Sequence, residues 1–129
     1  MLNGCTRYVP AERGDIIFIG STTENPYASM TPAIVSRCRV FELKRLSEEN
    51  IMTALRRALA DETRGLGKYK TAVSEEALRH IARMSAGDMR IAYNALELAV
   101  LTTPPAPTGE IVVTLKDAEE SIQQKALSF

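Results

Sequence analysis

The sequence has few of the residues that build metal centres or covalent cross-links. Among 129 residues it contains two cysteines, Cys5 and Cys38, and one histidine, His80. A structural zinc site takes four Cys or His ligands, and a disulfide framework takes several cysteine pairs, so both are excluded. We expect a chain from a reducing compartment. Cys38 is expected to be a small packing residue, and His80 a solvated residue on the outer face of a helix.

The sequence also lacks net charge and long apolar runs. Sixteen Lys and Arg residues balance sixteen Asp and Glu residues, which argues against a histone-like protein that binds nucleic acid by bulk charge. The longest apolar runs, such as Ile16–Ile19, are far shorter than the roughly 20 residues of a membrane span. Asn3, Gly4 and Arg7 interrupt any apolar stretch near the N-terminus, so no signal peptide is expected. With 45% apolar and 25% charged residues, the chain is expected to fold as a soluble protein.

Residues 11–46 have the pattern of an α/β segment. The run Asp15–Gly20 is short, apolar and rich in β-branched residues, which predicts a strand buried on both faces. We expect a turn after it, then a short helix over about 32–36 and an alternating strand over 39–43. Two strands do not form a stable sheet alone. Either most of the sheet lies outside this chain, or the segment rests against something else.

From Ser47 onward the pattern changes to that of four amphipathic helices. Ser47, Ser74, Asp88 and Thr114 are each placed to cap one of them. Apolar residues recur at helical spacing after each cap. Because such stripes can bury one another, residues 47–128 are predicted to form a small helical domain.

Two stretches imitate nucleotide-binding motifs without meeting their requirements. Gly65–Tyr69 resembles a phosphate loop, but Tyr69 follows Lys68 where Ser or Thr is needed, and a helix precedes it in place of a strand. Ala58–Glu62 resembles the end of a Walker B strand, but its apolar residues continue a helical stripe, so we expect a helix end there. Without a phosphate cradle or a magnesium carboxylate, the chain is not expected to hydrolyse a nucleotide alone.

Three polar segments carry candidates for contact with phosphate. Thr23 lies in the hydroxyl-rich segment after the first predicted strand, where α/β sheets place ligand-binding groups; the alternative is an ordinary turn. Arg37 and Arg39 are expected to alternate along an extended segment, so that one points outward, toward phosphoryl charge in a neighbouring subunit or into a surface salt bridge. Arg90 follows Asp88 in a first helical turn, where a cation needs an anionic partner, either a phosphate or a nearby acid.

The ordered set of these motifs resembles one protein family. The motifs are IGSTTENP at Ile19–Pro26, SRCRVF at Ser36–Phe41, GDMR at Gly87–Arg90 and NALE at Asn94–Glu97. Over roughly residues 11–127 the set is similar to the RarA/MgsA group of AAA+ ATPases, bacterial relatives of the Werner-helicase-interacting protein and akin to the clamp loaders. Met89 and Ser21 depart from the more usual small residue and alanine, and residues 1–10 match nothing in the family.

The resemblance implies a role for each candidate residue. Thr23 corresponds to the sensor-1 position, which probes the terminal phosphate and its water. Arg37 corresponds to the arginine finger that reaches the ATP of a neighbouring subunit. Arg90 corresponds to the sensor-2 arginine of the helical lid, which contacts the γ-phosphate within its own subunit. These roles imply ATP and Mg²⁺ as cofactors of the intact protein, and no cofactor that binds tightly to this chain alone.

The resemblance also implies a domain organisation and a function. The fold class is mainly α, a four-helix AAA+ lid domain over 47–128 preceded by residues 1–46, a remnant of a P-loop ATPase core with two strands and a helix. Family members carry the Walker motifs upstream and an oligomerisation domain downstream, so the chain is interpreted as a fragment. The intact protein is expected to be a cytoplasmic, nucleoid-associated bacterial ATPase that maintains replication forks. Its expected partners are further copies of itself, single-stranded or forked DNA and replication proteins, and no membrane.

Two other interpretations stay open. The chain could be part of a clamp-loader subunit, with the same motifs and a different partner. It could also be a stand-alone helical interaction module with a non-catalytic N-terminal arm, since the Walker motifs are missing. A Gly-Lys-Thr/Ser loop upstream in the full reading frame would eliminate the module.

Overall fold

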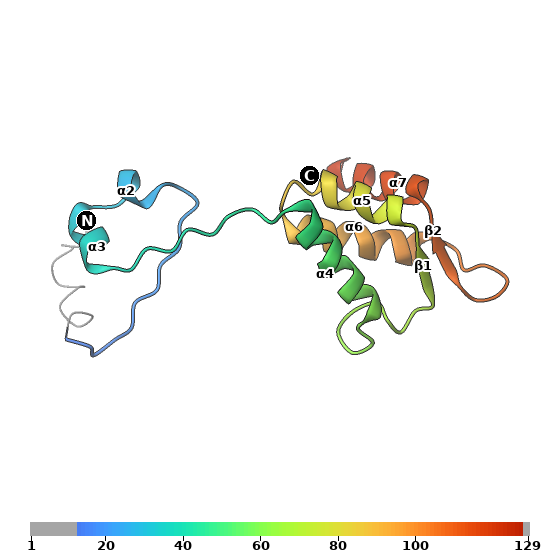
Figure 1. The fold of residues 1–129 in the computed structure, drawn as a ribbon, viewed down its shortest axis with the longest axis horizontal. Helices are drawn as coiled ribbons and strands as arrows, with labels where there is room; N and C mark the ends of the chain where they lie inside the picture. Colours follow the sequence, from blue (N-terminus) through green and yellow to red (C-terminus); the bar gives the residue numbers. More distant parts are fainter. Residues whose placement is uncertain (1–12, 128–129) are drawn as a thin grey trace. The chain divides into compact units, whose positions relative to one another are not determined.

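The chain is mainly helical, as predicted. The structure, a computed structural model, describes residues 13–127, which fall into two compact units that divide after Glu42. In chain order the elements are α2 (Pro26–Ser29), α3 (Pro32–Arg37), α4 (Glu48–Ala60), β1 (Thr71–Val73), α5 (Glu75–Met84), α6 (Met89–Thr102), β2 (Ile111–Val113) and α7 (Leu115–Leu127) (Figure 1). None of the helices among the described residues is long and apolar enough to cross a membrane.

The first unit contains the two short helices α2 and α3. Each begins at a proline, Pro26 or Pro32, whose fixed φ suits a first helical turn. The Asn25 carboxamide oxygen accepts the Tyr27 amide at 3.0 Å and caps α2. The α3 helix agrees with the one predicted over 32–36. No side chain is buried between residue 13 and the end of this unit.

The two strands predicted over 15–20 and 39–43 do not form. Both stretches are without regular structure, and their apolar side chains face solvent: Ile17 is 91% exposed and Phe41 is 76% exposed. A strand is held by hydrogen bonds to a neighbouring strand, and neither stretch has one among the described residues. Cys38 was expected to be a packing residue, but it is exposed, because nothing in the described part of the chain covers it.

The second unit is the predicted four-helix domain. Helices α4 and α7 each pack against both α5 and α6 (Figure 1). All four helices contribute buried side chains to one apolar core, which β2 extends through Val113. The largest fully buried apolar side chains are Ile51, Leu55, Ile81, Leu96, Val100 and Val113.

The predicted caps of these helices are in place. The Ser47 hydroxyl accepts the Asn50 amide at 3.2 Å and caps α4, and the Ser74 hydroxyl accepts the Ala77 amide at 3.2 Å and caps α5. At the start of α7 the Thr114 amide donates to an Asp117 carboxylate oxygen at 2.9 Å. The Asp117 amide donates back to the Thr114 hydroxyl at 3.5 Å, so the two residues form a capping box with Asp in place of Glu.

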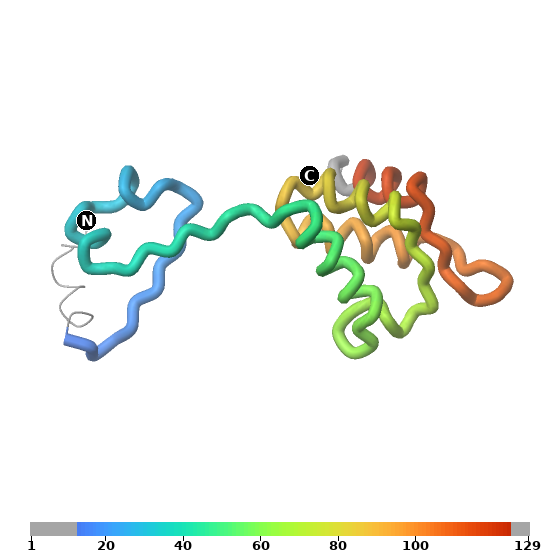
Figure 2. Tube along the Cα trace, viewed as in Figure 1, coloured from blue at the N-terminus to red at the C-terminus, as the bar shows by residue number. Residues whose placement is uncertain are grey.

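A short parallel ladder joins the starts of α5 and α7. Strand β1 pairs with β2 so that Thr71 lies opposite Ile111 and Val73 lies opposite Val113. The sequence pattern did not predict these strands, because each has only three residues and shows no sustained alternation. Figure 2 shows the proline-rich connection between α6 and β2 as a loop that extends away from the helices.

Candidate functional site

Thr23 lies in the turn that leads into α2. The turn is organised by its own polar groups: the Thr22 hydroxyl accepts the Glu24 amide at 3.1 Å, and Asn25 caps the helix. The Thr23 side chain is exposed and makes no hydrogen bond with any described residue. The hydrogen bonding of the segment is therefore that of an ordinary polar turn, with the Thr23 hydroxyl turned to solvent.

Arg37 is the last residue of α3. Its guanidinium is exposed, and Nη1 donates to the Ala33 carbonyl at 3.0 Å. Arg37 and Arg39 were expected along one extended segment, which is wrong, because Arg37 is still part of α3 and the extended backbone begins at the C-cap, Cys38. Arg37 thus belongs to a helix and Arg39 follows it. A cation at this end of a helix is favoured by the exposed carbonyl groups.

Arg90 is in the first turn of α6, next to the helix cap. Its amide donates to Asp88 Oδ1 at 2.9 Å, while its Nη2 lies 3.7 Å from Asp88 Oδ2. The Arg90 side chain is 90% exposed, and an ion pair so open to water contributes at most about 1 kcal/mol. Asp88 is thus a nearby acid of the kind that the sequence predicted as one possible partner of Arg90. Most of the guanidinium is still accessible to solvent.

The turn between α5 and α6 is held by a segment that sequence reasoning missed. The Arg45 Nη1 donates to the Ala86 carbonyl at 2.9 Å, and the Leu46 amide donates to the Gly87 carbonyl at 3.3 Å. Ala86 and Gly87 both have positive φ, of 51° and 85°. The Gly-Asp pair at 87–88 indicates a turn and a cap in the sequence, but nothing there shows that Arg45 contacts it.

The glycine loop after α4 is not a phosphate cradle, as predicted. The amides of Gly65 and Gly67 donate to the Asp61 carbonyl at 3.1 and 3.0 Å, and the Leu66 amide donates to the Ala58 carbonyl at 2.8 Å. These N–H groups are therefore used within the loop. The helix ends at Ala60, which also confirms that Ala58–Glu62 is a helix end.

The Asp61 carboxylate organises the same loop. It accepts the amides of Arg64 and Thr63 at 2.9 and 3.0 Å. These two hydrogen bonds, with a smaller contribution from the Arg64 guanidinium, hold the pKa of Asp61 below its usual value of 3.8. The charged form of Asp61 is therefore a structural group of this loop.

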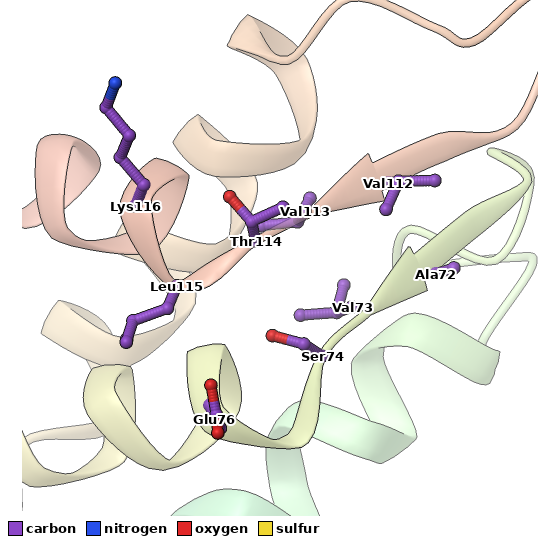
Figure 3. A pocket seen from close by; sticks show the side chains of 9 residues that line it. All are labelled: Ala72, Val73, Ser74, Glu76, Val112, Val113, Thr114, Leu115 and Lys116. Atoms are coloured by element: carbon purple, nitrogen blue, oxygen red, sulfur yellow. The ribbon is translucent and has the colours of Figure 1, made fainter.

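An open apolar hollow of about 530 Å³ lies where β1 and β2 lead into α5 and α7 (Figure 3). Val73, Val113 and Leu115 line it together with Ser74 and Thr114. The hydroxyls of Ser74 and Thr114 already serve as helix caps. Thr23, Arg37 and Arg90 do not line this hollow.

The three candidate residues are divided between the two units. Thr23 and Arg37 belong to the first and Arg90 to the second, and each unit is described by itself. Their assembly around one nucleotide is a proposal. Among the side chains that the structure describes, no group of three or more His, Cys, Asp and Glu could hold a metal ion. The arginine guanidinium groups are of the chemical type that binds phosphate through charge-assisted hydrogen bonds.

Comparison with known proteins confirms the resemblance. Residues 67–129 match the family model described as AAA C-terminal domain. The chain is 52% identical over 117 residues to replication-associated recombination protein A of Bacillus subtilis, covering 91% of this chain and 28% of that protein. It is 46% identical over 87 residues to the protein of that name from Escherichia coli K12, covering 67% and 20%. It is 39% identical over 89 residues to ATPase WRNIP1 of Dictyostelium discoideum, covering 69% and 10%. The chain thus spans less than a third of the length of each of these relatives.

Proposed function

Since this chain is a relative of replication-associated recombination protein A, we propose that it is the sensor and lid portion of an AAA+ ATPase of replication and recombination. Arg90 contacts the phosphates of ATP within its own subunit, and Arg37 contacts the ATP of a neighbouring subunit. Thr23 probes the terminal phosphate and the attacking water. The observation that carries the proposal is the exposed Arg90 guanidinium at the capped N-terminus of α6, inside the segment that matches the AAA C-terminal domain.

The surroundings of Arg90 suit an anion. The N-terminus of α6 carries partial positive charge and the guanidinium a full one, and the Asp88 carboxylate offsets part of this charge. A guanidinium can donate two parallel hydrogen bonds to phosphate oxygens, which fixes direction as well as distance. Because the ion pair with Asp88 is exposed, exchanging it for a phosphate costs little free energy.

The geometry of Arg37 suits contact with a phosphate outside its own unit. Its guanidinium is exposed at the end of α3, and its bond to Ala33 is to a neutral carbonyl on the surface. A hydrogen bond from a guanidinium to a charged phosphate is stronger than one to a neutral carbonyl. Phosphoryl transfer depends mostly on positioning and on stabilising the charge of the transferred group, and a guanidinium supplied by another subunit does both.

ATP and Mg²⁺ are proposed as the cofactors of the full-length protein. The contribution proposed for this chain is the contact of Arg37, Arg90 and Thr23 with phosphate and water. The full-length protein is proposed to act as a homo-oligomer on single-stranded or forked DNA in replication, recombination and repair. It is proposed to be associated with the bacterial nucleoid, with other replication proteins as partners. The names of the relatives, replication-associated recombination protein A and ATPase WRNIP1, support the parts of this proposal that concern replication, recombination and ATP hydrolysis.

Substitution of the two arginines in the full-length protein tests the proposal. Arg37→Ala is expected to abolish DNA-stimulated ATP hydrolysis with ATP affinity nearly unchanged, because the residue acts on a neighbour's nucleotide. Arg90→Ala is expected to alter both hydrolysis and affinity. Arg39→Ala is the matched control, since Arg39 is also exposed and follows α3, and it should behave as wild type. Wild-type turnover in both the Arg37 and the Arg90 variant would refute the proposal.

A further inference from the structure

The turn that precedes Arg90 has an unfavourable backbone conformation. Ala86 and Gly87 are consecutive residues with φ of 51° and 85°, in the left-handed region. Glycine adopts this region freely, but alanine does not, because its Cβ approaches the following carbonyl. A residue held in such a conformation needs support from its surroundings.

Arg45 and Leu46 provide that support. The charged Arg45 Nη1 donates to the Ala86 carbonyl at 2.9 Å, and the Leu46 amide donates to the Gly87 carbonyl at 3.3 Å. The approach is close, since a Cβ placed on Gly87 would lie 2.7 Å from the Arg45 Cβ and 3.1 Å from the Leu46 carbonyl oxygen. Both residues with positive φ, the strained Ala86 and the neighbouring Gly87, are therefore bonded to the segment directly before the cap of α4.

The supported turn continues directly into the cap of α6. The Asp88 amide donates to the carbonyl of Ser85 at 3.0 Å, and Ser85 is buried. Asp88 in turn accepts the Arg90 amide. A continuous series of hydrogen-bonded and covalently linked residues thus runs from Arg45 through the turn to Arg90.

We propose that Arg45 is a positioning residue for Arg90. By holding the Ala86 carbonyl, it fixes the turn that orients the first turn of α6, and with it the direction in which the Arg90 guanidinium meets phosphate. This role rests on the function proposed for Arg90. The contacts of Arg45 and Leu46 with the turn also link the start of α4 to the start of α6. A displacement of residues 45–46 is therefore expected to change the position of Arg90.

Amide hydrogen exchange in this chain tests the structural part of the proposal. Arg45→Ala is expected to accelerate exchange at Arg90 and Ala92 roughly three- to tenfold, since their amides depend on Asp88. Arg45→Lys should restore much of the protection, because lysine also donates a charged hydrogen bond. Arg79→Ala, which removes an exposed arginine of α5 with no bond to the turn, is the matched control and should leave these amides unchanged. Unchanged exchange in Arg45→Ala would overturn the proposal.

ATPase kinetics of the full-length protein test the functional part. Arg45→Ala is expected to raise the KM for ATP several-fold, and the Arg45→Ala/Arg90→Ala double variant should match Arg90→Ala alone, because one residue acts through the other. Additive effects would show an independent, merely structural role and overturn the proposal. If Arg90→Ala raises KM and Arg45→Ala does not, only the positioning role fails. If Arg90→Ala itself leaves KM and kcat at wild-type values, the proposed function fails, and the positioning role with it.

Discussion

Asp88 contacts Arg90 twice, once through the backbone and once through the side chain. Its Oδ1 accepts the Arg90 amide at 2.9 Å, and its Oδ2 lies 3.7 Å from the Arg90 Nη2. The first contact satisfies an N–H group that the helix itself leaves unpaired. The second is an exposed ion pair. The two contacts have different energies, so substitutions at position 88 can separate them.

Asp88→Ala is expected to lower the free energy of unfolding by about 1 kcal/mol, because it removes the cap of α6. Asp88→Asn keeps an oxygen that can accept the Arg90 amide and removes only the ion pair, so it should lie within about 0.5 kcal/mol of wild type. Urea unfolding followed by circular dichroism measures both. Equal losses in the two variants would show that the charge, and not the cap, stabilises this end of α6.

Gly87→Ala is expected to destabilise the chain more than Gly109→Ala. Both glycines have a positive φ, 85° and 83°, so both substitutions introduce backbone strain of about 1–2 kcal/mol. At Gly109 a Cβ meets nothing within 4 Å, whereas at Gly87 it lies 2.7 Å from the Arg45 Cβ. The overlap should add about 1–3 kcal/mol to the loss at Gly87.

Thermal unfolding of the two glycine variants provides the comparison. Each serves as the other's reference, because the left-handed strain is shared and only the crowding differs. Equal decreases in Tm would contradict the close approach of Arg45 to the turn.

Leu96→Ala is expected to lower the free energy of unfolding by about 2–5 kcal/mol, because Leu96 is fully buried in the core and its loss leaves a cavity. Leu101→Ala on the same helix is the matched control. Leu101 is 56% exposed, so its truncation should change stability by no more than about 0.5 kcal/mol. Denaturant unfolding measures the unfolding free energy of both variants. Similar losses in the two would contradict the burial of Leu96 in the core.

The stability of the chain is expected to depend on Asp61 at acid pH. Its pKa is below 3.8 in the folded state, chiefly because the amides of Arg64 and Thr63 donate to the carboxylate. The unfolded state therefore takes up a proton at a higher pH than the folded state does. The charged Asp61 carboxylate makes its full contribution to the free energy of unfolding above pH 3.8. This contribution is lost as the pH falls through the lower pKa that Asp61 has in the folded state.

Asp61→Asn provides the test, because asparagine can still accept a hydrogen bond but does not titrate. The difference in unfolding free energy between wild type and Asp61→Asn should be constant near neutral pH and shrink below pH 3.8. A difference that stays constant down to about pH 2, well below the usual carboxyl pKa, would contradict the lowered pKa.

Helix starts could be predicted from the sequence because they depend on nearby residues. Ser47, Ser74 and Asp88 bond to amides two or three residues ahead, and Thr114 pairs with Asp117 three residues ahead. Such contacts are visible in a linear sequence. The mainly helical class and the four-helix unit followed from these caps together with the apolar periodicity.

What could not be predicted depends on distant residues. The ladder joins Val73 to Val113, and Arg45 reaches Ala86 across 41 residues, so no local pattern records either contact. At 15–20 and 39–43 the sequence predicts strands that do not form. The composition of these stretches is typical of strands, but the described chain supplies no neighbouring strand with which they could pair. The roles proposed for Thr23 and Arg37 also remain predictions, because they involve contact with a nucleotide that no local pattern of the sequence records.

The order of the elements along the chain also has a consequence for synthesis on the ribosome. During synthesis α4, α5 and α6 emerge before β2 and α7, so the side chains of α5 and α6 that pack against α7 are not covered by it until it has emerged. At roughly 5–20 residues per second, α5 waits a few seconds for α7. Throughout that interval part of its apolar face is open to other chains. A nascent protein paused between α6 and β2 therefore exposes apolar side chains of α5 and α6 that α7 covers in the folded chain.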